Sequence, residues 1–164
     1  MAADSNFEVA FKKATIEVCN MFGISTLYDK QEEALKHFFS GRDVFVNLPT
    51  CYGKSLIFQA VPIMADLIYK KGKGSSLMIV ISPLKSLLED QVRSLREMNI
   101  AAVCVTEAHD DSLVQKTING EFTHIYGSPE CFLSSTWRGI LSTKKFKDSL
   151  VCVAVDEAHC ISQW

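Results

Sequence analysis

Apolar positions along the chain follow two periods, one typical of helices and one typical of buried strands. The first twenty residues repeat apolar side chains at the spacing of one helix face. Ser5 and Glu8 have the spacing of a capping box, and Gly23 ends the pattern. The repeated apolar positions are Phe7, Phe11, Ala14 and Val18. The pattern therefore predicts an N-terminal helix that begins near Ser5, and we assign residues 1–24 to this segment.

Further along, short apolar runs alternate with segments of helical period. The runs predict strands at residues 44–46, 77–81, 101–105, 123–126 and 150–155. Helices are predicted at 29–39 and 54–69, from Ser82-Pro83 onward, from Asp110-Asp111 to Gly120, and from Pro129. The run at 150–155 is uninterrupted, which predicts a strand buried on both faces of a parallel sheet. Strict alternation of strand and helix predicts a three-layer α/β domain with a mostly parallel sheet and right-handed crossovers.

Composition restricts the broad class of protein but does not indicate its function. The chain has 164 residues, 48% of them hydrophobic, which is enough for one domain with a real core. The net charge is -2, so any contact with nucleic acid has to rest on local charge. No apolar run is long enough for a membrane helix, and the start lacks the pattern of a secretory signal. The 6 cysteines are scattered without metal-ligand spacing, which favours a reducing intracellular compartment.

Candidate chemistry gathers where two of the predicted strands end. The stretch PTCYGKS at 49–55 follows the first strand, and it contains the Gly53-Lys54-Ser55 of a phosphate-binding loop. Such a loop offers backbone N–H groups and a helix N-terminus to phosphate, a lysine to the β- and γ-phosphates, and a hydroxyl to Mg²⁺. Leu48, Cys51 and Tyr52 stand where such loops often have small residues, so a positive φ at Cys51 or Tyr52 would be strained.

The second stretch with candidate catalytic residues is DEAH at 156–159, directly after the last predicted strand. One of its two carboxylates, Asp156 or Glu157, can hold hydrated Mg²⁺ while its neighbour orients the attacking water. His159 is read either as a reporter of the site's state or as a surface histidine, and the residue alone favours neither. The other histidines (His37, His109 and His124) are interpreted as structural.

Four stretches in order, PTCYGKSLIFQ, ISPLKSLLEDQV, YGSPE and VDEAHCISQW, resemble motifs I, Ia, Ib and II of superfamily 2 helicases. The combination is most similar to the RecQ family of ATP-dependent DNA helicases, and FGISTLYDKQEEAL resembles that family's adenine-recognition motif. The resemblance implies a RecA-like P-loop NTPase lobe over residues 25–164 that is incomplete at its C-terminus. It also implies ATP and Mg²⁺ as cofactors and single-stranded and duplex DNA as partners. The implied activity is 3′-to-5′ unwinding in recombination and repair. The implied location is intracellular, nuclear in a eukaryote and cytoplasmic in a prokaryote.

The resemblance also implies a role for each matching residue. Glu157 would be the catalytic base, Asp156 would position the metal with Ser55, and Lys54 would bind phosphate. The nucleotide would further contact Gln31, Tyr28, Thr50 and Gly53. Single-stranded DNA would lie along Ser82, Pro83, Ser128, Pro129 and Glu130. His159 and Gln163 would couple hydrolysis to DNA. All of this requires that Lys54 and the acidic pair converge on one nucleotide.

Departures from the family pattern leave alternatives open. Tyr28 replaces an arginine and Cys51 a glycine, and the second lobe with its arginine finger lies outside the 164 residues. We therefore expect this chain alone to bind ATP weakly and to be nearly inactive in hydrolysis and unwinding. One rival is a non-catalytic nucleotide- or partner-binding module of the same fold, and a second is a fragment of a DEAH-type RNA helicase. A purely structural reading, with GKS as a turn and DEAH as a cap, is disfavoured by the four ordered motifs.

Overall fold

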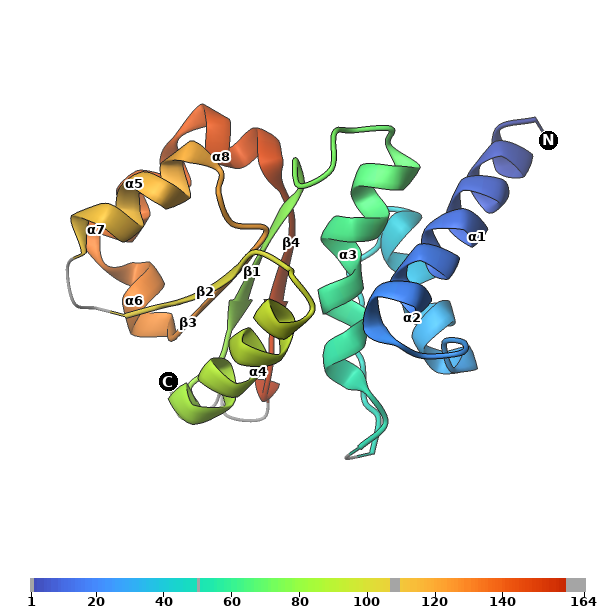
Figure 1. Ribbon diagram of the computed structural model, residues 1–164, viewed down its shortest axis with the longest axis horizontal. Helices are drawn as coiled ribbons and strands as arrows, with labels where there is room; N and C mark the ends of the chain where they lie inside the picture. The colour runs from blue at the N-terminus through green and yellow to red at the C-terminus, as the bar shows by residue number, and fades with distance from the viewer. Residues whose placement is uncertain (1, 50, 107–109, 159–164) are drawn as a thin grey trace. The chain divides into compact units, whose positions relative to one another are not determined.

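The computed structural model describes residues 2–49, 51–106 and 110–158, and of residues 2–5 the backbone alone. The chain divides into two compact units, Met1–Lys73 and Gly74–Trp164. Each unit is built around its own elements, which are labelled in Figure 1. The predicted division at residues 24 and 25 falls inside the first unit and stays a prediction.

The first unit consists of helices α1 (Ala2–Phe22), α2 (Asp29–Phe39) and α3 (Lys54–Ile68). Both α1 and α2 pack on α3. Each helix contributes side chains with no exposed surface, namely Ala14 and Val18 from α1, Leu35 from α2, and Ala60, Met64 and Ala65 from α3. The ring of Phe11 lies 6.3 Å from that of Phe39 in an edge-on arrangement, which adds a favourable aromatic contact to the buried area. The three helices were predicted, but α1 begins at Ala2, so Ser5 lies inside the helix and not at its predicted start.

The predicted strand at residues 44–46 is wrong. Residues 42–49 have no regular secondary structure, and Phe45 in their centre is 84% exposed. A strand exists only through hydrogen bonds to a neighbouring strand, and no strand of the described residues pairs with this segment. The apolar run indicates a segment that could form a strand, but its sequence carries no information on whether a partner strand is present.

The second unit is built on a four-stranded sheet in the order β2-β3-β1-β4. The strands are β1 (Leu77–Ile81), β2 (Ala102–Val105), β3 (His124–Gly127) and β4 (Leu150–Val155). All three pairings are parallel, with Ile79 opposite Ile125 on one side and Val153 on the other. Parallel neighbours require crossover connections, which the intervening helices supply. The predicted α/β class with a parallel sheet is confirmed.

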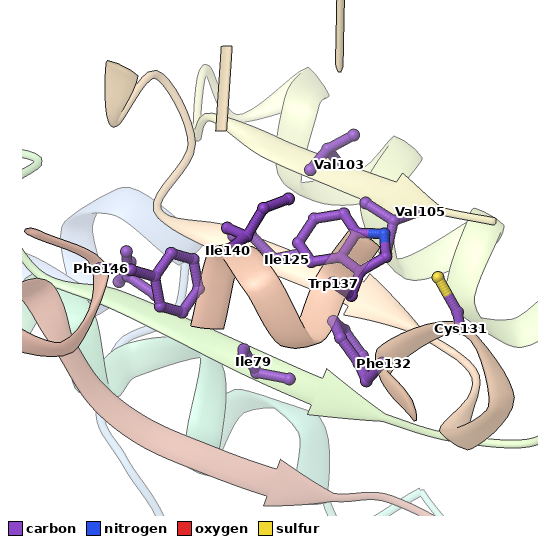
Figure 2. Packing of buried hydrophobic residues seen from close by; sticks show 10 residues of the cluster. Ile79, Val103, Val105, Ile125, Cys131, Phe132, Trp137, Ile140 and Phe146 are labelled. Atoms are coloured by element: carbon purple, nitrogen blue, oxygen red, sulfur yellow. The ribbon is translucent and has the colours of Figure 1, made fainter. Parts of the chain in front are cut away.

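Helices cover both faces of this sheet. Alternate residues of the strands, such as Ile79, Val103 and Ile125, pack with Phe132, Trp137, Ile140 and Phe146 of the helices after β3, as Figure 2 shows. Helix α4 (Lys85–Glu97) packs on β2 and β3 and buries Leu88, Val92 and Leu95. Residues of the opposite parity, including Met78 and Tyr126, are also fully buried. The sheet is therefore the middle layer of three, as predicted.

The remaining helices are α5 (Asp111–Asn119), α6 (Pro129–Leu133), α7 (Ser135–Ser142) and α8 (Lys144–Ser149). Asp110 caps α5 by accepting a hydrogen bond from the Leu113 N–H, and Gly120 ends it in the left-handed region. Both were predicted. Helices α7 and α8 were not predicted, because they are short and carry few apolar residues. Helix α4 begins at Lys85, later than the Ser82-Pro83 start that the sequence indicated.

Strand β4 differs from its predicted environment. Among the strands of the described residues it has one neighbour, β1, and its side chains Val153 and Val155 are 53% and 42% exposed. The prediction that both faces are buried is therefore wrong for this edge strand. An apolar run identifies a strand that can be buried, and the number of neighbours decides whether it is.

Candidate nucleotide site

The predicted phosphate loop leads directly into α3. Gly53 is the N-cap of α3 with φ +68°, and as a glycine it has no side chain that could cap the first turn of that helix. The N–H groups of a first turn have no partner within the helix, and together they form an anion-binding site. Lys54 opens the helix, and its Nζ donates to the Leu48 carbonyl at 3.1 Å, which folds the lysine back over the loop. Ser55 follows on the same turn and is half-buried.

A single buried amide ties this loop to α2. Gln31 is 2% exposed, and its Nε2 donates to the carbonyls of Tyr52 at 3.2 Å and Gly53 at 3.1 Å. Its Oε1 accepts the Tyr28 N–H at 2.9 Å. Both amide hydrogens of Gln31 are therefore used on the loop backbone. In this conformation Gln31 holds the loop, and a contact between Gln31 and adenine would require one of these hydrogen bonds to be exchanged.

Two loop residues have left-handed backbone conformations. A Cβ at Gly53 would lie 2.5 Å from Nε2 of Gln31, so only glycine fits there. Cys51 has φ +67°, the conformation in which a side chain was expected to be strained. A non-glycine residue in that region costs roughly 1–2 kcal/mol. The loop thus retains one required glycine and carries strain at the position where the related family has another.

An aromatic pair stands beside the loop. The rings of Tyr28 and Tyr52 lie 5.7 Å apart with their planes tilted by 49°. Tyr28 is 59% and Tyr52 46% exposed, although aromatic residues usually bury more of their surface. The two tilted rings present exposed apolar surface at the phosphate loop. The family resemblance predicts a nucleotide contact for Tyr28, whereas for Tyr52 the sequence indicates only a bulky residue within the loop.

In the second unit, three of the predicted motif segments meet at the carboxyl ends of neighbouring strands. The segments at Ser82, Ser128 and Asp156 follow β1, β3 and β4. The Asp156 N–H donates to the Ile81 carbonyl at 2.9 Å, and the Ser82 N–H donates to the Gly127 carbonyl at 3.2 Å. Ligands of parallel sheets bind at this edge. Chain segments that are far apart in the sequence are therefore joined there by backbone hydrogen bonds.

The acidic pair has a defined conformation. Asp156 Oδ1 accepts the Glu157 N–H at 3.0 Å, and Asp156 Oδ2 accepts from Gln91 Nε2 of α4 at 3.1 Å. Glu157 has φ +54°, a strained value for a residue with a side chain. A carboxylate has about four lone-pair positions, so two remain on Asp156 for another partner. One carboxylate with free lone pairs fits Mg²⁺, which usually takes one or two protein carboxylates together with phosphates and water.

The predicted DNA-contacting residues differ in accessibility. Ser82 is fully buried, and its Oγ accepts the Leu84 N–H at 3.4 Å, so its hydroxyl shapes the turn before α4. Pro83, Ser128 and Pro129 are half-buried, and Glu130 is exposed. Hydrogen bonds from its own backbone N–H and from the Ser128 hydroxyl lower the pKa of Glu130. A carboxylate that stays ionised repels phosphate, so any contact of Glu130 with DNA would be to sugar or base.

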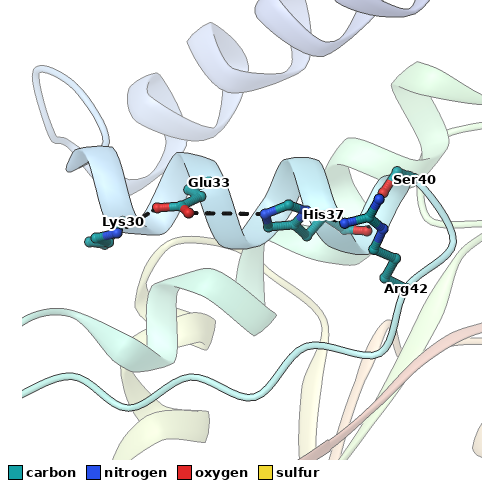
Figure 3. Close-up of polar contacts among 5 residues, drawn as sticks. All are labelled: Lys30, Glu33, His37, Ser40 and Arg42. Atoms are coloured by element: carbon teal, nitrogen blue, oxygen red, sulfur yellow. Dashed lines mark hydrogen bonds and ion pairs between the residues drawn. The ribbon is translucent and has the colours of Figure 1, made fainter.

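Other titratable residues lie away from these segments. On α2, His37 lies 4.0 Å from Glu33, which pairs with Lys30 at 2.7 Å, as Figure 3 shows. His124 is fully buried, with its Nδ1 2.8 Å from the Thr123 hydroxyl. These surroundings support the structural interpretation of both histidines. Within the described residues, no cluster of three or more His, Cys, Asp or Glu side chains could hold a metal ion, and no helix is long and apolar enough to cross a bilayer.

Burial also governs two of the cysteines. Burial raises the pKa of the Cys152 thiol to about 11, and it raises that of Cys104 as well. Both thiols lie in strands, as predicted, and stay protonated at neutral pH. Cys51, in the phosphate loop, is exposed.

With this geometry established, comparison with known proteins defines the class. The profile described as DEAD/DEAH box helicase matches residues 28–164, so the chain belongs to the DEAD/DEAH box helicase family. It is 36% identical over 149 residues to the ATP-dependent helicase SGS1 of Saccharomyces cerevisiae, covering 88% of this chain and 10% of that protein. It is 33% identical over 150 residues to the ATP-dependent DNA helicase RecQ of Haemophilus influenzae, covering 88% of this chain and 22% of that protein. The mouse bifunctional 3'-5' exonuclease/ATP-dependent helicase WRN is 39% identical over 123 residues, which is 75% of this chain and 8% of that protein.

These relatives confirm the resemblance to RecQ helicases that the four motifs predicted. The chain spans between 8% and 22% of the length of the relatives named here. Thr50, His109, His159 and Gln163 lie outside the described residues, so their predicted roles stay predictions. Lys54 lies in the first unit and Asp156 in the second, and their convergence on one nucleotide also stays a prediction.

Proposed function

We propose that this chain is the ATP-binding lobe of an ATP-dependent DNA helicase of the RecQ type. The observation that carries the proposal is the arrangement of the motif segments in the second unit. Three of them follow neighbouring parallel strands and are joined by the backbone hydrogen bonds of Asp156 and Ser82. Family membership and the loop that opens α3 at Lys54 support the same conclusion.

In this proposal the phosphates of ATP lie at the N-terminus of α3. The first-turn N–H groups and Lys54 Nζ, released from the Leu48 carbonyl, donate to the phosphate oxygens. Tyr28 stacks on the adenine, and Tyr52 extends the same apolar surface. Gln31 keeps the loop in place through its two carbonyl contacts, and Gly53 allows the backbone to approach closely.

Asp156 and Ser55 would hold Mg²⁺, which supplies charge neutralisation of the phosphates when it is bound. Glu157 would accept the proton of the attacking water. The left-handed backbone of Glu157 and the hydrogen bond from its N–H to Asp156 Oδ1 hold the backbone of the two residues in one arrangement, and hydrolysis depends mainly on positioning. The second lobe that completes the catalytic site belongs, in this proposal, to the same protein.

The proposed substrate is DNA in single-stranded and duplex form, translocated 3′ to 5′ during recombination and repair. The relatives' names support DNA, since that of Haemophilus influenzae is an ATP-dependent DNA helicase. Contacts along the strand ends at Pro83, Ser128 and Pro129 would be to the sugar–phosphate backbone, which explains why a chain of net charge -2 can serve. The proposed location is intracellular, nuclear in a eukaryote and cytoplasmic in a prokaryote.

Equilibrium binding of a fluorescent ATP analogue to the purified chain tests the proposal. We expect binding that requires Lys54 and that Lys54→Ala weakens, while Lys71→Ala, an exposed lysine of the same unit, leaves it unchanged. Binding that is equal in all three proteins would contradict the proposal. Competition between single-stranded DNA and RNA then separates the DNA helicase from the RNA helicase alternative, because preference for RNA would favour the latter. Nucleotide binding with no nucleic-acid binding would favour the non-catalytic module.

A further inference from the structure

Helix α4 carries a polar residue on its buried face. The inward positions of α4 are Leu88, Val92 and Leu95, and Gln91 lies among them at 9% exposure. Burial of an amide without a hydrogen bond is unfavourable, so a glutamine at such a position needs a partner. Its Nε2 donates to Oδ2 of Asp156, 65 residues further along the chain.

We infer that Gln91 is a positioning residue that holds the Asp156 carboxylate in the orientation in which it binds Mg²⁺. This inference rests on the proposed function. Gln91 fixes one oxygen of Asp156 from α4, and the Glu157 N–H fixes the other at 3.0 Å. Donors on both oxygens fix the plane of the carboxylate, and each oxygen keeps a lone pair directed away from them.

The chemical nature of Gln91 fits this role better than a cationic residue would. A lysine or arginine at this position would also orient the carboxylate, but its charge would neutralise Asp156 and repel a divalent cation. A neutral amide orients the carboxylate and leaves its charge in place. Groups that hydrogen-bond to metal ligands in this way commonly contribute 10–100-fold to metal affinity.

The experiment measures how strongly Mg²⁺ tightens nucleotide binding. The Mg²⁺ increment is defined here as the Kd of a fluorescent ADP analogue in EDTA divided by its Kd in saturating Mg²⁺. We expect Gln91→Met, which keeps the shape and removes the donor, to reduce this increment about tenfold. The Kd in EDTA should not change, whereas general damage to the fold would weaken binding in both conditions.

Three further variants complete the design. Arg93→Met, which removes the exposed Arg93–Asp90 contact of the same helix, should leave the increment unchanged. Asp156→Asn should abolish the increment, and Gln91→Met added to it should have no further effect. Gln91→Asn keeps the amide but shortens the side chain, and it should reproduce the loss if Gln91→Met fails to fold.

The outcomes separate the inference from the proposed function. A wild-type increment in Gln91→Met and Gln91→Asn, together with its loss in Asp156→Asn, would overturn the inference and leave the proposed function intact. An increment that survives Asp156→Asn would overturn the assignment of Asp156 to the metal, and the inference with it.

Discussion

The two regions that carry the candidate catalytic residues, the phosphate loop and the acidic end of β4, are stabilised in different ways. The phosphate loop of the first unit follows a segment that pairs with no strand in the described part of the chain, and Gln31 supplies two hydrogen bonds to the loop backbone. The acidic end of β4 continues a parallel ladder through the Asp156 N–H, and its carboxylate receives donors on both oxygens. A loop held by one side chain depends on that side chain. A strand end that belongs to a sheet is held by several backbone hydrogen bonds, so its position depends less on any one side chain.

Each of the two regions contains one residue with a strained backbone conformation. Cys51 in the loop and Glu157 after β4 both have positive φ. At Glu157 the neighbouring ladder and the contact with Asp156 can maintain the unfavourable conformation. Near Cys51 the loop is held by the Tyr52 N–H, which donates to the Pro49 carbonyl at 3.3 Å, and by the hydrogen bond from Gln31 to the Tyr52 carbonyl. The comparison therefore predicts that the loop responds more strongly than the strand end to single substitutions.

The largest expected effect belongs to Lys54→Ala. Hydrogen bonds from a charged group contribute about 1.5–3 kcal/mol, so the affinity for an ATP analogue should fall about 10–150-fold. The melting temperature should change little, because the ammonium contacts a loop carbonyl and no buried charge. Calorimetric titration and thermal melting measure the two quantities. Unchanged affinity would show that the loop does not hold phosphate.

Removal of the hydrogen bonds from Gln31 to the phosphate loop should have the next largest effect. Gln31→Leu keeps the volume but removes the donors to Tyr52 and Gly53 and the acceptor for the Tyr28 N–H, which should destabilise the protein by about 2 kcal/mol. Nucleotide affinity should fall with it because the loop loses its anchor. Denaturant unfolding gives the stability, and Gln115→Leu, at an exposed position of α5, is the matched control. Equal stability of Gln31→Leu and wild type would contradict the comparison.

Relief of strain at Cys51 should be smaller and of opposite sign. Cys51→Gly places the residue that tolerates φ +67° and should stabilise the protein by about 1 kcal/mol, with tighter nucleotide binding. Cys51→Ala retains a Cβ and should show no such gain. If both variants were equally destabilised in denaturant unfolding, Cys51 would not be strained in solution.

The smallest effect concerns pH and the buried strand thiol. Because burial raises the pKa of Cys152 to about 11, the unfolded chain loses this proton at lower pH than the folded protein does. The unfolded state then binds fewer protons, so stability falls as pH rises from about 8.5 toward 11, by less than about 1 kcal/mol at pH 9. Denaturant unfolding at several pH values measures this slope. Cys152→Val should flatten it, and an identical slope in that variant would assign the effect to other groups.

Much of the second unit could be predicted from the sequence because local signals there agree with the global fold. Strands β1 and β4 have the predicted bounds, and Asp110 and Gly120 delimit α5 as their side-chain chemistry requires. Where prediction failed, the missing information was about neighbours. The sequence of residues 44–46 and of β4 shows that they can pair and be buried, but it does not show which strands lie beside them.

The motif residues of the candidate site could be predicted from the sequence, but the side chains that hold them in place could not. Lys54, Asp156 and Glu157 have recognisable spacing to strand ends, whereas the roles of Gln31 in holding the loop and of Gln91 in holding Asp156 depend on contacts across long sequence separations. One signal could have exposed Gln91, which is that it shares the inward face of α4 with leucines and valine. A polar residue on an apolar helix face calls for a partner.

The central claim is that Lys54 and Asp156 act on one Mg²⁺–nucleotide complex. A double-mutant cycle of Lys54→Ala and Asp156→Asn on the Kd of the ATP analogue in Mg²⁺ tests it most directly. Residues that share a ligand couple, so we expect the two losses to be non-additive by at least about 1 kcal/mol. Losses that add within about 0.5 kcal/mol would place the two residues at independent sites and contradict the claim.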